Sequence, residues 1–392
     1  MSSNNSNETD NVDADLNDPW ARARKVLEEK KAIAARAKAV ISGEALQAKK
    51  DAVEVVEAEA TQGETPASDD SGEPGKPEKK VNRQTVSYLS RRFEEVGLNP
   101  NRRHGQNFLV DLNLIQMIAK SADLGKNDVV LEVGTGMGSL TGMLAAKAAH
   151  VVTVEIDGFL YQMAAEELES FDNIEMLKQD ALKNKNQFDD RVIEAIKKAL
   201  ADSPYRKFKL AANLPYNIAT PVIANLLRSE VIPATMSVTI QKELADRITA
   251  KPGSKDYGSL SVWVQSMADA ELIRVMPPHV FWPRPKVDSA ILKIVHRPDK
   301  SASIPDIDFF YAFVRAMFFH RRKYMRSVAV AAFKGQLSKP QIDEVLSEAG
   351  LREDSRTEQL AVAELQSLCE LFRQKLIAIT GEEKPRLANQ GK

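Results

Sequence analysis

The chain has 392 residues, of which 43% are hydrophobic, so it is long enough for two or three domains and apolar enough for packed cores. No apolar run approaches the roughly 18–20 residues of a membrane span. A single cysteine, Cys369, excludes a disulfide framework and a cysteine-based zinc site. The acidic start of the chain has the features of neither a secretory signal nor a transit peptide, so we expect a cytoplasmic protein. We also expect no bound metal ion.

Residues 1–80 differ in composition from the rest of the chain. The whole chain has 54 Lys and Arg against 55 Asp and Glu, but residues 1–78 carry a net charge of −7 and the remainder one of +6. Residues 1–19 are polar and predicted to be disordered, and residues 20–60 are rich in Ala, Glu, Lys and Arg, which favour helix. Residues 61–80 contain the glycines and prolines of a flexible linker. We therefore expect a low-complexity acidic extension before a basic body that suits a polyanionic partner.

Strands and helices alternate between residues 81 and 298. Short apolar runs predict strands, and apolar residues at helical spacing predict the helices between them. The expected strands span residues 128–133, 151–155, 174–178, 208–212, 236–241, 270–276 and 289–296, and the expected helices span residues 112–119, 140–149, 159–170, 189–201 and 221–229. This alternation predicts an α/β catalytic domain with a Rossmann-like, seven-stranded and mostly parallel sheet. No long helix joins the last two strands, so we expect them to form an antiparallel pair.

The rest of the chain is predicted to be helical only. Helical spacing recurs at residues 309–318, 323–333, 339–349 and 361–377. We expect a small all-helical domain over residues 299–380, followed by a tail at residues 381–392.

A glycine loop follows the first predicted strand. Gly134, Gly136 and Gly138 have the spacing G-x-G-x-G, Glu155 ends the second strand, and Asp180 follows the third. Glycines let a ligand lie against the backbone, and the acid after the second strand can accept both ribose hydroxyls. Two alternatives remain: a tight turn without a ligand, and a dinucleotide oxidoreductase, whose fingerprint is G-x-G-x-x-G. Because the third glycine comes one residue early, the pattern favours S-adenosylmethionine, which has no phosphates, and a class I methyltransferase sheet.

The fourth predicted strand ends in Asn213-Leu-Pro-Tyr-Asn217, at the edge where open α/β sheets place their chemistry. The N6 amine of adenine is a poor nucleophile because its lone pair is delocalised into the ring. An Asn oxygen and a backbone carbonyl that accept the N6–H bonds favour a pyramidal nitrogen, and proline fixes the backbone that presents the carbonyl. An aromatic ring can then stack on the extracted base. A plain turn is the alternative, but the position of the motif favours methylation of an exocyclic amine.

With these motifs, the sequence resembles the ribosomal RNA adenine N6-dimethyltransferases of the bacterial KsgA/RsmA type, over about two-thirds of its length. The resemblance extends from about Arg102 to about Leu371. The blocks that carry it are residues 105–109 (GQNFL), 132–141, 154–157 (VEID), 179–181 (QDA), 213–217 (NLPYN), 241–243 (QKE), 257–261 (YGSLS), 280–289 (VFWPRPKVDS) and 321–323 (RRK).

The resemblance implies a role for each matching residue. Asn213 and the Leu214 carbonyl would orient the target N6, and Tyr216 would stack on the base. Glu155 would hold the ribose, and Asp180 the adenine amine of the cofactor. The implied cofactor-binding residues are Asn107, Leu109, Gly134, Glu155, Asp180 and Asn213. The implied contacts with substrate RNA come from Phe281, as the other face of the target pocket, and from Arg321, Arg322 and Lys323.

Basic residues also gather in three places. They are residues 320–326, residues 102–104, and Arg247 with Lys251 and Lys255. Each cluster alone is typical of a solvated face, but three of them around a base-modifying site favour contacts with RNA phosphates. His104 and Ser327 stand where the family usually has other residues, which leaves the detailed RNA contacts open.

The expected function is S-adenosylmethionine-dependent N6-dimethylation of two adjacent adenines in the 3′-terminal hairpin of 16S rRNA, linked to ribosome biogenesis. We expect a monomer that acts on small-subunit rRNA or the pre-30S particle and needs no membrane. One alternative is a 23S rRNA adenine N6-methyltransferase of the antibiotic-resistance type, against which residues 285–288 (PKVD) and the basic C-terminal domain argue. The other is a non-catalytic RNA-binding or transcription factor on the same fold, against which the intact Glu155, Asp180 and Asn213 argue.

Overall fold

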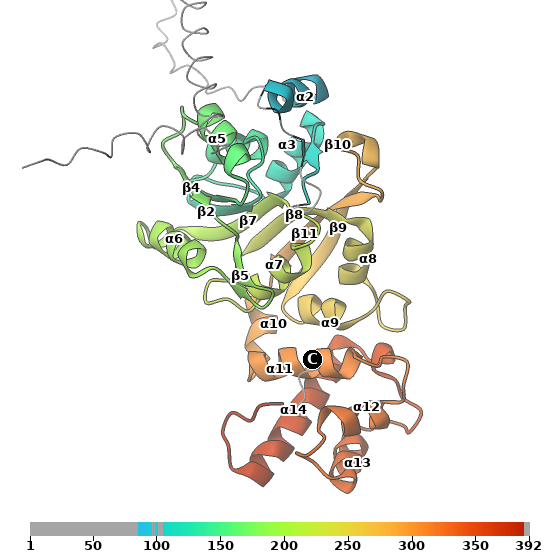
Figure 1. Cartoon of the computed structure of the whole chain (residues 1–392). Helices are drawn as coiled ribbons and strands as arrows, with labels where there is room; N and C mark the ends of the chain where they lie inside the picture. Colours follow the sequence, from blue (N-terminus) through green and yellow to red (C-terminus); the bar gives the residue numbers. More distant parts are fainter. Residues whose placement is uncertain (1–84, 96, 98, 101–104, 388–392) are drawn as a thin grey trace, which may run out of the picture. The chain divides into compact units, whose positions relative to one another are not determined.

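The structure is a computed structural model that describes residues 85–95, 97, 99–100 and 105–387 (Figure 1). These residues belong to the compact unit Glu78–Lys392. The expectations for residues 1–80, for the basic residues 102–104 and for the last five residues of the tail lie outside the described residues.

One seven-stranded sheet has the strand order β4-β3-β2-β7-β8-β11-β9. The strands are β2 (Asp128–Val133), β3 (His150–Glu155), β4 (Ile174–Lys178), β7 (Lys207–Asn213), β8 (Thr235–Gln241), β9 (Ala268–Met276) and β11 (Ser289–His296). The first five in this order pair in parallel, whereas β11 pairs antiparallel with both β8 and β9. The predicted α/β fold, with a mostly parallel sheet and an antiparallel last pair, is confirmed.

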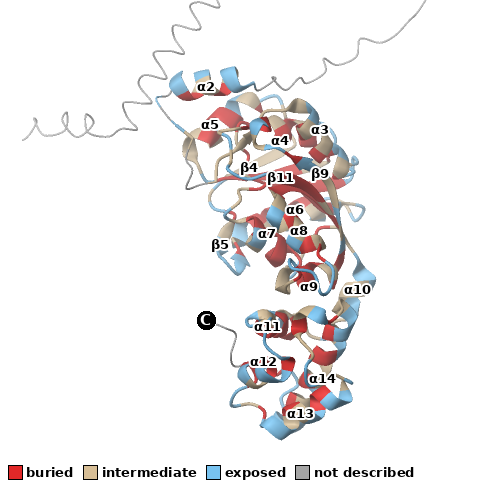
Figure 2. Cartoon of the chain, turned by 90° about the vertical axis from the view of Figure 1, so that its right-hand side faces the viewer, coloured by how far each residue is buried: buried red, intermediate tan, exposed pale blue. Residues whose placement is uncertain are grey.

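Helices cover both faces of this sheet because its central strands are apolar on both sides. All six residues of β2 are buried, and its neighbours Val130 and Leu131 belong to different cores on opposite faces. The helices α3 (Leu112–Ser121) and α4 (Ser139–Ala145) pack into one core. The other core includes the helices α6 (Asp190–Ala201), α7 (Ala219–Leu226), α8 (Lys242–Thr249) and α9 (Ser259–Gln265), and it continues into the C-terminal helices. Figure 2 shows the buried residues gathered along the strands and on the inward sides of the helices.

Several short elements lie beside the sheet and were not predicted. Helix α2 (Val86–Glu95) precedes the strand pair β1 (Phe108–Leu109) and β10 (Phe281–Trp282). By contrast, α5 (Gly158–Glu167), which follows β3, is the helix predicted over residues 159–170 and ends three residues earlier. A small hairpin of β5 (Leu182–Asn184) and β6 (Gln187–Phe188) follows β4, and a 3-10 turn (Pro278–Val280) precedes β10.

The helix predicted over residues 140–149 is four residues too long at its end. Helix α4 ends at Ala145, and the backbone N–H groups of Lys147 and Ala148 both donate to the carbonyl of Leu144. This turn directs the chain into β3, which begins at His150. The Ala-rich sequence has no glycine or proline to mark the stop, so local propensity alone extends the helix.

The C-terminal part is helical, as predicted. Its elements are α10 (Pro298–Ala302), α11 (Ile307–Phe318), α12 (Met325–Ala332), α13 (Lys339–Glu348), a 3-10 turn (Thr357–Gln359) and α14 (Val362–Thr380). Phe333 and Phe372 stack at its centre with ring centroids 4.3 Å apart, and Phe313 packs beside both. No helix in the described part of the chain is long and apolar enough to cross a membrane.

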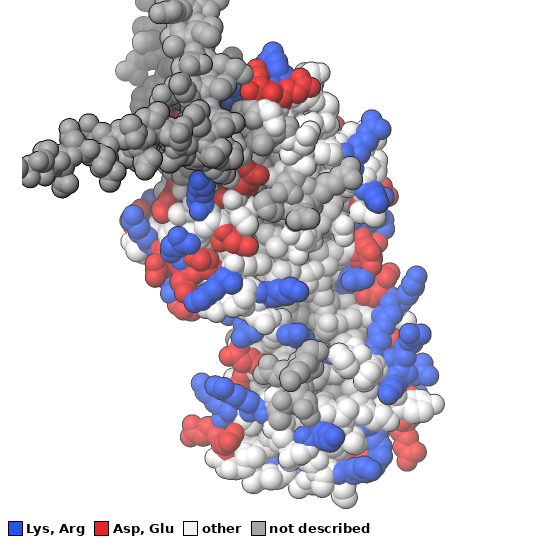
Figure 3. Space-filling view, viewed as in Figure 1, with Lys and Arg blue, Asp and Glu red and all other residues white. Residues whose placement is uncertain are grey.

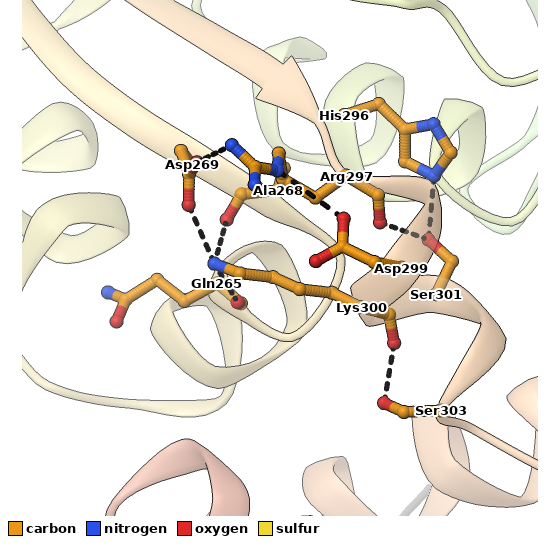
Figure 4. Close-up of polar contacts among 9 residues, drawn as sticks. All are labelled: Gln265, Ala268, Asp269, His296, Arg297, Asp299, Lys300, Ser301 and Ser303. Atoms are coloured by element: carbon orange, nitrogen blue, oxygen red, sulfur yellow. Dashed lines mark hydrogen bonds and ion pairs between the residues drawn. The ribbon is translucent and has the colours of Figure 1, made fainter.

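A polar joint connects β11 to α10 (Figure 4). One carboxylate oxygen of Asp269, on edge strand β9, is 3.2 Å from Arg297 Nη1, and the other is 2.6 Å from Lys300 Nζ. His296 Nε2 lies 2.6 Å from Ser301 Oγ. These contacts attach the first turn of the helical part to the edge of the sheet.

Candidate active site

A cavity of about 1140 Å³, including its open mouth, lies where β2, β3, β4 and β7 end. Its walls come from residues 132–137, 154–156, 179–181 and 213–218, which follow or end these strands, and from residues 105–109. The carboxyl ends of parallel strands are the usual position of a ligand site in an open α/β sheet. The structure therefore brings the glycine loop, both predicted acids and the Asn213 motif into one cavity.

The glycine loop needs glycine for its backbone shape. Gly134, Gly136 and Gly138 have φ angles of +88°, +57° and +81°, which side chains with a Cβ rarely adopt. A Cβ on Gly134 would lie 3.4 Å from the ring of Pro215, and one on Gly136 would lie 3.4 Å from the ring of Phe108. The loop is therefore both strained for other residues and closely covered by the two segments beside it.

Glu155 lines the cavity and binds the backbone of the glycine loop. Its carboxylate accepts hydrogen bonds from the backbone N–H groups of Gly136 (2.9 Å) and Asp157 (3.0 Å). Each oxygen has further lone pairs for a ligand. Burial raises the pKa of Glu155 to about 7, so the carboxylate titrates in the neutral range.

Asp180 and Ile156 border the same cavity from the ends of β4 and β3. Asp180 is exposed and accepts a 2.9 Å hydrogen bond from the N–H of Leu182. Ile156 is 48% exposed although it is apolar, so it offers a flat apolar surface beside Glu155. Ile156 was not among the predicted site residues, although its position directly after Glu155 is a signal that the sequence contains.

A second carboxyl group, Glu132, is buried below the loop. It accepts hydrogen bonds from the hydroxyls of Thr141 (2.6 Å) and Thr153 (2.8 Å). Burial raises its pKa to about 8 despite these hydrogen bonds.

Over the described residues, no group of three or more His, Cys, Asp or Glu side chains could hold a metal ion.

The side-chain amide of Asn213 has a defined orientation. Its Nδ2 donates a 2.9 Å hydrogen bond to the backbone carbonyl of Asn107, so Oδ1 is the remaining acceptor end of the amide. Leu214 is buried, and its N–H donates to the carbonyl of Thr239 at 3.1 Å, which ties the motif to β8. Both contacts fix the backbone and the side chain at the end of β7.

The segment from Gly105 to Leu109 lies across this motif. Gly105 has φ +68°, and a Cβ there would meet Asn217 Oδ1 at 2.9 Å and the ring of Pro215 at 3.3 Å. Asn107 donates from its side chain to the carbonyl of Gly105 at 3.2 Å. Leu109 is buried but still borders the cavity. The close approach explains why the chain has a glycine at position 105.

Tyr216 borders the cavity and is half-buried. Its hydroxyl lies 2.5 Å from the hydroxyl of Ser289, the fully buried first residue of β11. Burial raises the pKa of Tyr216. Ser289 was not among the predicted site residues, because a serine at the start of a strand gives no signal of its own.

Two of the residues predicted to contact RNA, Phe281 and Arg321, pack against other parts of the protein. Phe281 is 1% exposed, packs in the core with Leu109 and Ile115, and does not border the cavity. Its pairing with Leu109 in the β1–β10 ladder accounts for that burial. The predicted role of Phe281 as a face of the target pocket stays a prediction, which its burial does not support.

Two nitrogens of the Arg321 guanidinium contact protein atoms, although the side chain is 37% exposed. Nη1 donates to the backbone carbonyls of Lys255 (2.7 Å) and Tyr257 (3.0 Å), and Nε lies 3.7 Å from the carboxylate of Glu358. Arg321 thus ties the loop between α8 and α9 to the helical part.

Arg322 and Lys323 are exposed, as are Lys251 and Lys255. Figure 3 shows Lys and Arg side chains gathered on the side where α8 and α9 approach the helical part. Ser327 is exposed on α12. These four residues form the exposed basic surface, whereas Arg321 also binds backbone carbonyls.

Known proteins are similar to this chain in sequence and in fold. A family model described as ribosomal RNA adenine dimethylase matches residues 97–373. Ribosomal RNA small subunit methyltransferase A from Streptococcus agalactiae is 39% identical over 283 residues, which cover 72% of this chain and 95% of that protein. The protein of the same name from Moorella thermoacetica is 39% identical over 275 residues, covering 70% of this chain and 93% of that protein.

A solved structure, that of a dimethyladenosine transferase from Plasmodium falciparum, has the same fold. It is 24% identical, with a TM-score of 0.56, and the match covers 68% of this chain and 97% of that one. The family model matches more than half of the chain, and the curated relatives are matched over nearly their whole length. The chain therefore belongs to the ribosomal RNA adenine dimethylase family.

Proposed function

We propose that the protein uses S-adenosylmethionine to dimethylate N6 of two adjacent adenines in the 3′-terminal hairpin of 16S rRNA. Membership of the family supports the reaction, and the names of the relatives support small-subunit rRNA as the substrate. The observation that carries the proposal is the hydrogen bond from Asn213 Nδ2 to the Asn107 carbonyl. Because this bond occupies the donor end of the amide, Oδ1 is the end that can accept a hydrogen bond from an amine.

The walls of the cavity fit S-adenosylmethionine. The glycine loop offers a backbone without side chains, and the Glu155 carboxylate can accept the two ribose hydroxyls. Asp180 can accept from an adenine amine, and Ile156 offers an apolar surface for a ring. Asn107 and Leu109 complete the proposed set of cofactor-binding residues with Gly134 and Asn213. The cofactor supplies a methyl group that is activated by its bond to a sulfonium.

The chain's own residues prepare the amine. Asn213 Oδ1 and the carbonyl of Leu214 accept the N6–H bonds, which draws the lone pair of N6 out of conjugation with the ring. Tyr216 stacks on the flipped base and fixes its plane. The proton of N6 becomes acidic as the methyl group attaches and is then lost to solvent water, so no strong base is needed. Holding the amine in line contributes up to about 7–11 kcal/mol of barrier reduction.

We further propose that exposed lysines and arginines where the loop between α8 and α9 meets the helical part bind RNA phosphates. The candidates are Arg322 and Lys323 of the helical part and Lys251 and Lys255 of the loop between α8 and α9. Phosphate contacts position the RNA without reading its sequence. The proposed substrate is small-subunit rRNA within the pre-30S particle, methylated in the cytoplasm by a monomer of this chain.

Transfer of tritiated methyl groups tests the proposal. The purified protein is incubated with undermethylated small ribosomal subunits and, separately, with large-subunit rRNA, and the products are mapped by primer extension. We expect label on two adjacent adenines near the 3′ end of 16S rRNA. Label on 23S rRNA alone would overturn the substrate assignment, and a chain that binds no S-adenosylmethionine in a titration would be a binding protein instead.

A further inference from the structure

Helix α2 lies outside the part of the chain that the family model matches, which begins at residue 97. Leu89 and Phe93, four residues apart on one face of the helix, are its buried residues, with 1% and 4% exposure. They pack in a separate apolar cluster with Met137, Leu160 and Met163. Figure 2 shows the outer side of α2 exposed to solvent.

This cluster is also part of the wall of the active-site cavity. Met137 and Leu160 border the cavity on their other side, and so does Phe108, which packs on the same cluster. The ring of Phe108 lies against Gly136 of the glycine loop. Helix α2 therefore covers the outer side of the wall whose inner side faces the proposed cofactor.

Three aromatic rings join α2 to that wall. The centroid of the Phe93 ring is 5.6 Å from that of Phe108 and 5.3 Å from that of Trp282, in tilted and edge-to-face arrangements. Phe108 and Trp282 are paired in the β1–β10 ladder, with ring centroids 6.1 Å apart. Phe93 thus packs against both members of the strand pair that carries residues 108 and 109 past the cavity.

Polar contacts at the edge of this cluster attach α2 to α5. The hydroxyl of Tyr88 donates to the carboxylate of Glu167, and Arg92 Nη2 lies 3.1 Å from a carboxylate oxygen of Glu166. These partners set the register of α2, which places Phe93 over Phe108.

We propose that Phe93 is a positioning residue for the cofactor. Its ring holds Phe108 against the glycine loop and keeps the neighbouring Asn107 carbonyl in place for Asn213. The inference rests on the proposed function, because it assigns the cavity to S-adenosylmethionine. A chain without this ring has a looser cavity wall, so it binds the cofactor more weakly although every cofactor-binding residue is present.

The test compares Phe93→Leu and Phe93→Ala with wild type in the full chain. Leucine keeps the apolar burial that docks α2 but lacks the ring, so thermal unfolding near the wild-type temperature shows that the fold is intact. We expect the dissociation constant and the KM for S-adenosylmethionine to rise about two- to tenfold, in line with the loss of aromatic pairs. The kcat at saturating cofactor and the affinity for small-subunit rRNA should stay within about twofold of wild type.

Glu94→Ala is the matched control, since Glu94 is the exposed neighbour of Phe93 on the same helix. It should leave the dissociation constant unchanged. Wild-type cofactor affinity in Phe93→Leu and Phe93→Ala, or an equal loss in Glu94→Ala, would overturn the assignment. Failure of the proposed function is a different result, because then the wild-type chain itself shows no binding of S-adenosylmethionine and no methyl transfer.

Discussion

Tyr216 in the motif after β7 and Ser289 at the start of β11 join two strands of the sheet through hydroxyl groups 2.5 Å apart. This contact fixes the plane of a ring that borders the cavity. It connects the proposed stacking platform to the antiparallel end of the sheet rather than to a loop.

Tyr216→Phe should therefore remain active, because the ring carries the stacking and no proton transfer is assigned to the hydroxyl. Tyr216→Ala removes a stacking surface worth about 1–3 kcal/mol and should impair capture of the flipped adenine. Ser289→Ala removes the same hydrogen bond from the other side and should match Tyr216→Phe. The test is the single-turnover rate of methylation of small subunits by the three variants. A Phe variant as inactive as the Ala variant would contradict the stacking role.

Asn213→Ala should lower turnover far more than RNA affinity. The hydrogen bond to Oδ1 becomes stronger as N6 turns pyramidal, so its loss falls mainly on the transition state. Deletions of this kind lower kcat by about 10²–10³-fold. The measurement pairs a single-turnover rate with an RNA-binding titration at fixed salt. A fully active variant would refute the proposed geometry.

Glu155 should make cofactor binding depend on pH near neutrality. Burial raises its pKa to about 7, so the carboxylate is ionised above that pH and is then the stronger acceptor for ribose hydroxyls. Affinity for S-adenosylmethionine should rise between pH 6 and pH 8 in wild type. In Glu155→Gln the affinity should be weaker, by about tenfold or more at pH 8, and nearly flat with pH, because a charged hydrogen bond is lost. Equal pH profiles would exclude Glu155 as the titrating group.

Glu132 should lower the stability of the protein as the pH rises. Burial raises its pKa from 4.5 to about 8, so its contribution to stability is complete below pH 4.5 and is lost as the pH rises through 8. Glu132→Gln keeps an acceptor for both threonine hydroxyls but cannot ionise. The difference in free energy of unfolding between Glu132→Gln and wild type, measured in urea, should therefore change in favour of the variant between pH 5 and pH 8. The exposed Glu348→Gln variant should show no such gain.

Arg321 and its two basic neighbours should separate folding from RNA binding. Arg321→Ala removes hydrogen bonds to two backbone carbonyls, so the melting temperature should fall while the salt dependence of RNA binding stays the same. The double variant Arg322→Ala, Lys323→Ala should keep the melting temperature. Its log–log salt slope should fall by about 0.7–0.9 for each RNA phosphate that the variant no longer binds. An unchanged melting temperature with a lower salt slope in Arg321→Ala would mean that Arg321 binds RNA.

Strong local patterns account for most of the fold that the sequence predicted. Strands β2, β4 and β11 have the predicted bounds, because each is an apolar run between turn residues. The strand pair β1 and β10 escaped prediction because two-residue strands have no period to detect. Helix α2 escaped as well, since only Leu89 and Phe93 of its residues are buried.

The site was predictable where a residue's role follows from its place on a strand. Glu155 and Asn213 lie at strand ends, so the parallel sheet brings them together. The surroundings that the structure gives Phe281 and Arg321 could not be predicted in this way. Nothing in the sequence distinguishes a ring that packs in a core from one that faces a ligand, or a guanidinium that binds carbonyls from one that faces solvent.

The joint at Asp269 restrains the helical part against the edge of the sheet. Each of its carboxylate oxygens has its own cation, and Arg321 ties the opposite side of the junction to the loop between α8 and α9. A hinge needs one free side, and this junction is attached on both. If the helical part binds RNA phosphates as proposed, the distance between those phosphates and the active site is constant. Only an adenine at the matching distance from the bound phosphates can reach Asn213. The target is then selected by its distance along the RNA rather than by the surrounding base sequence.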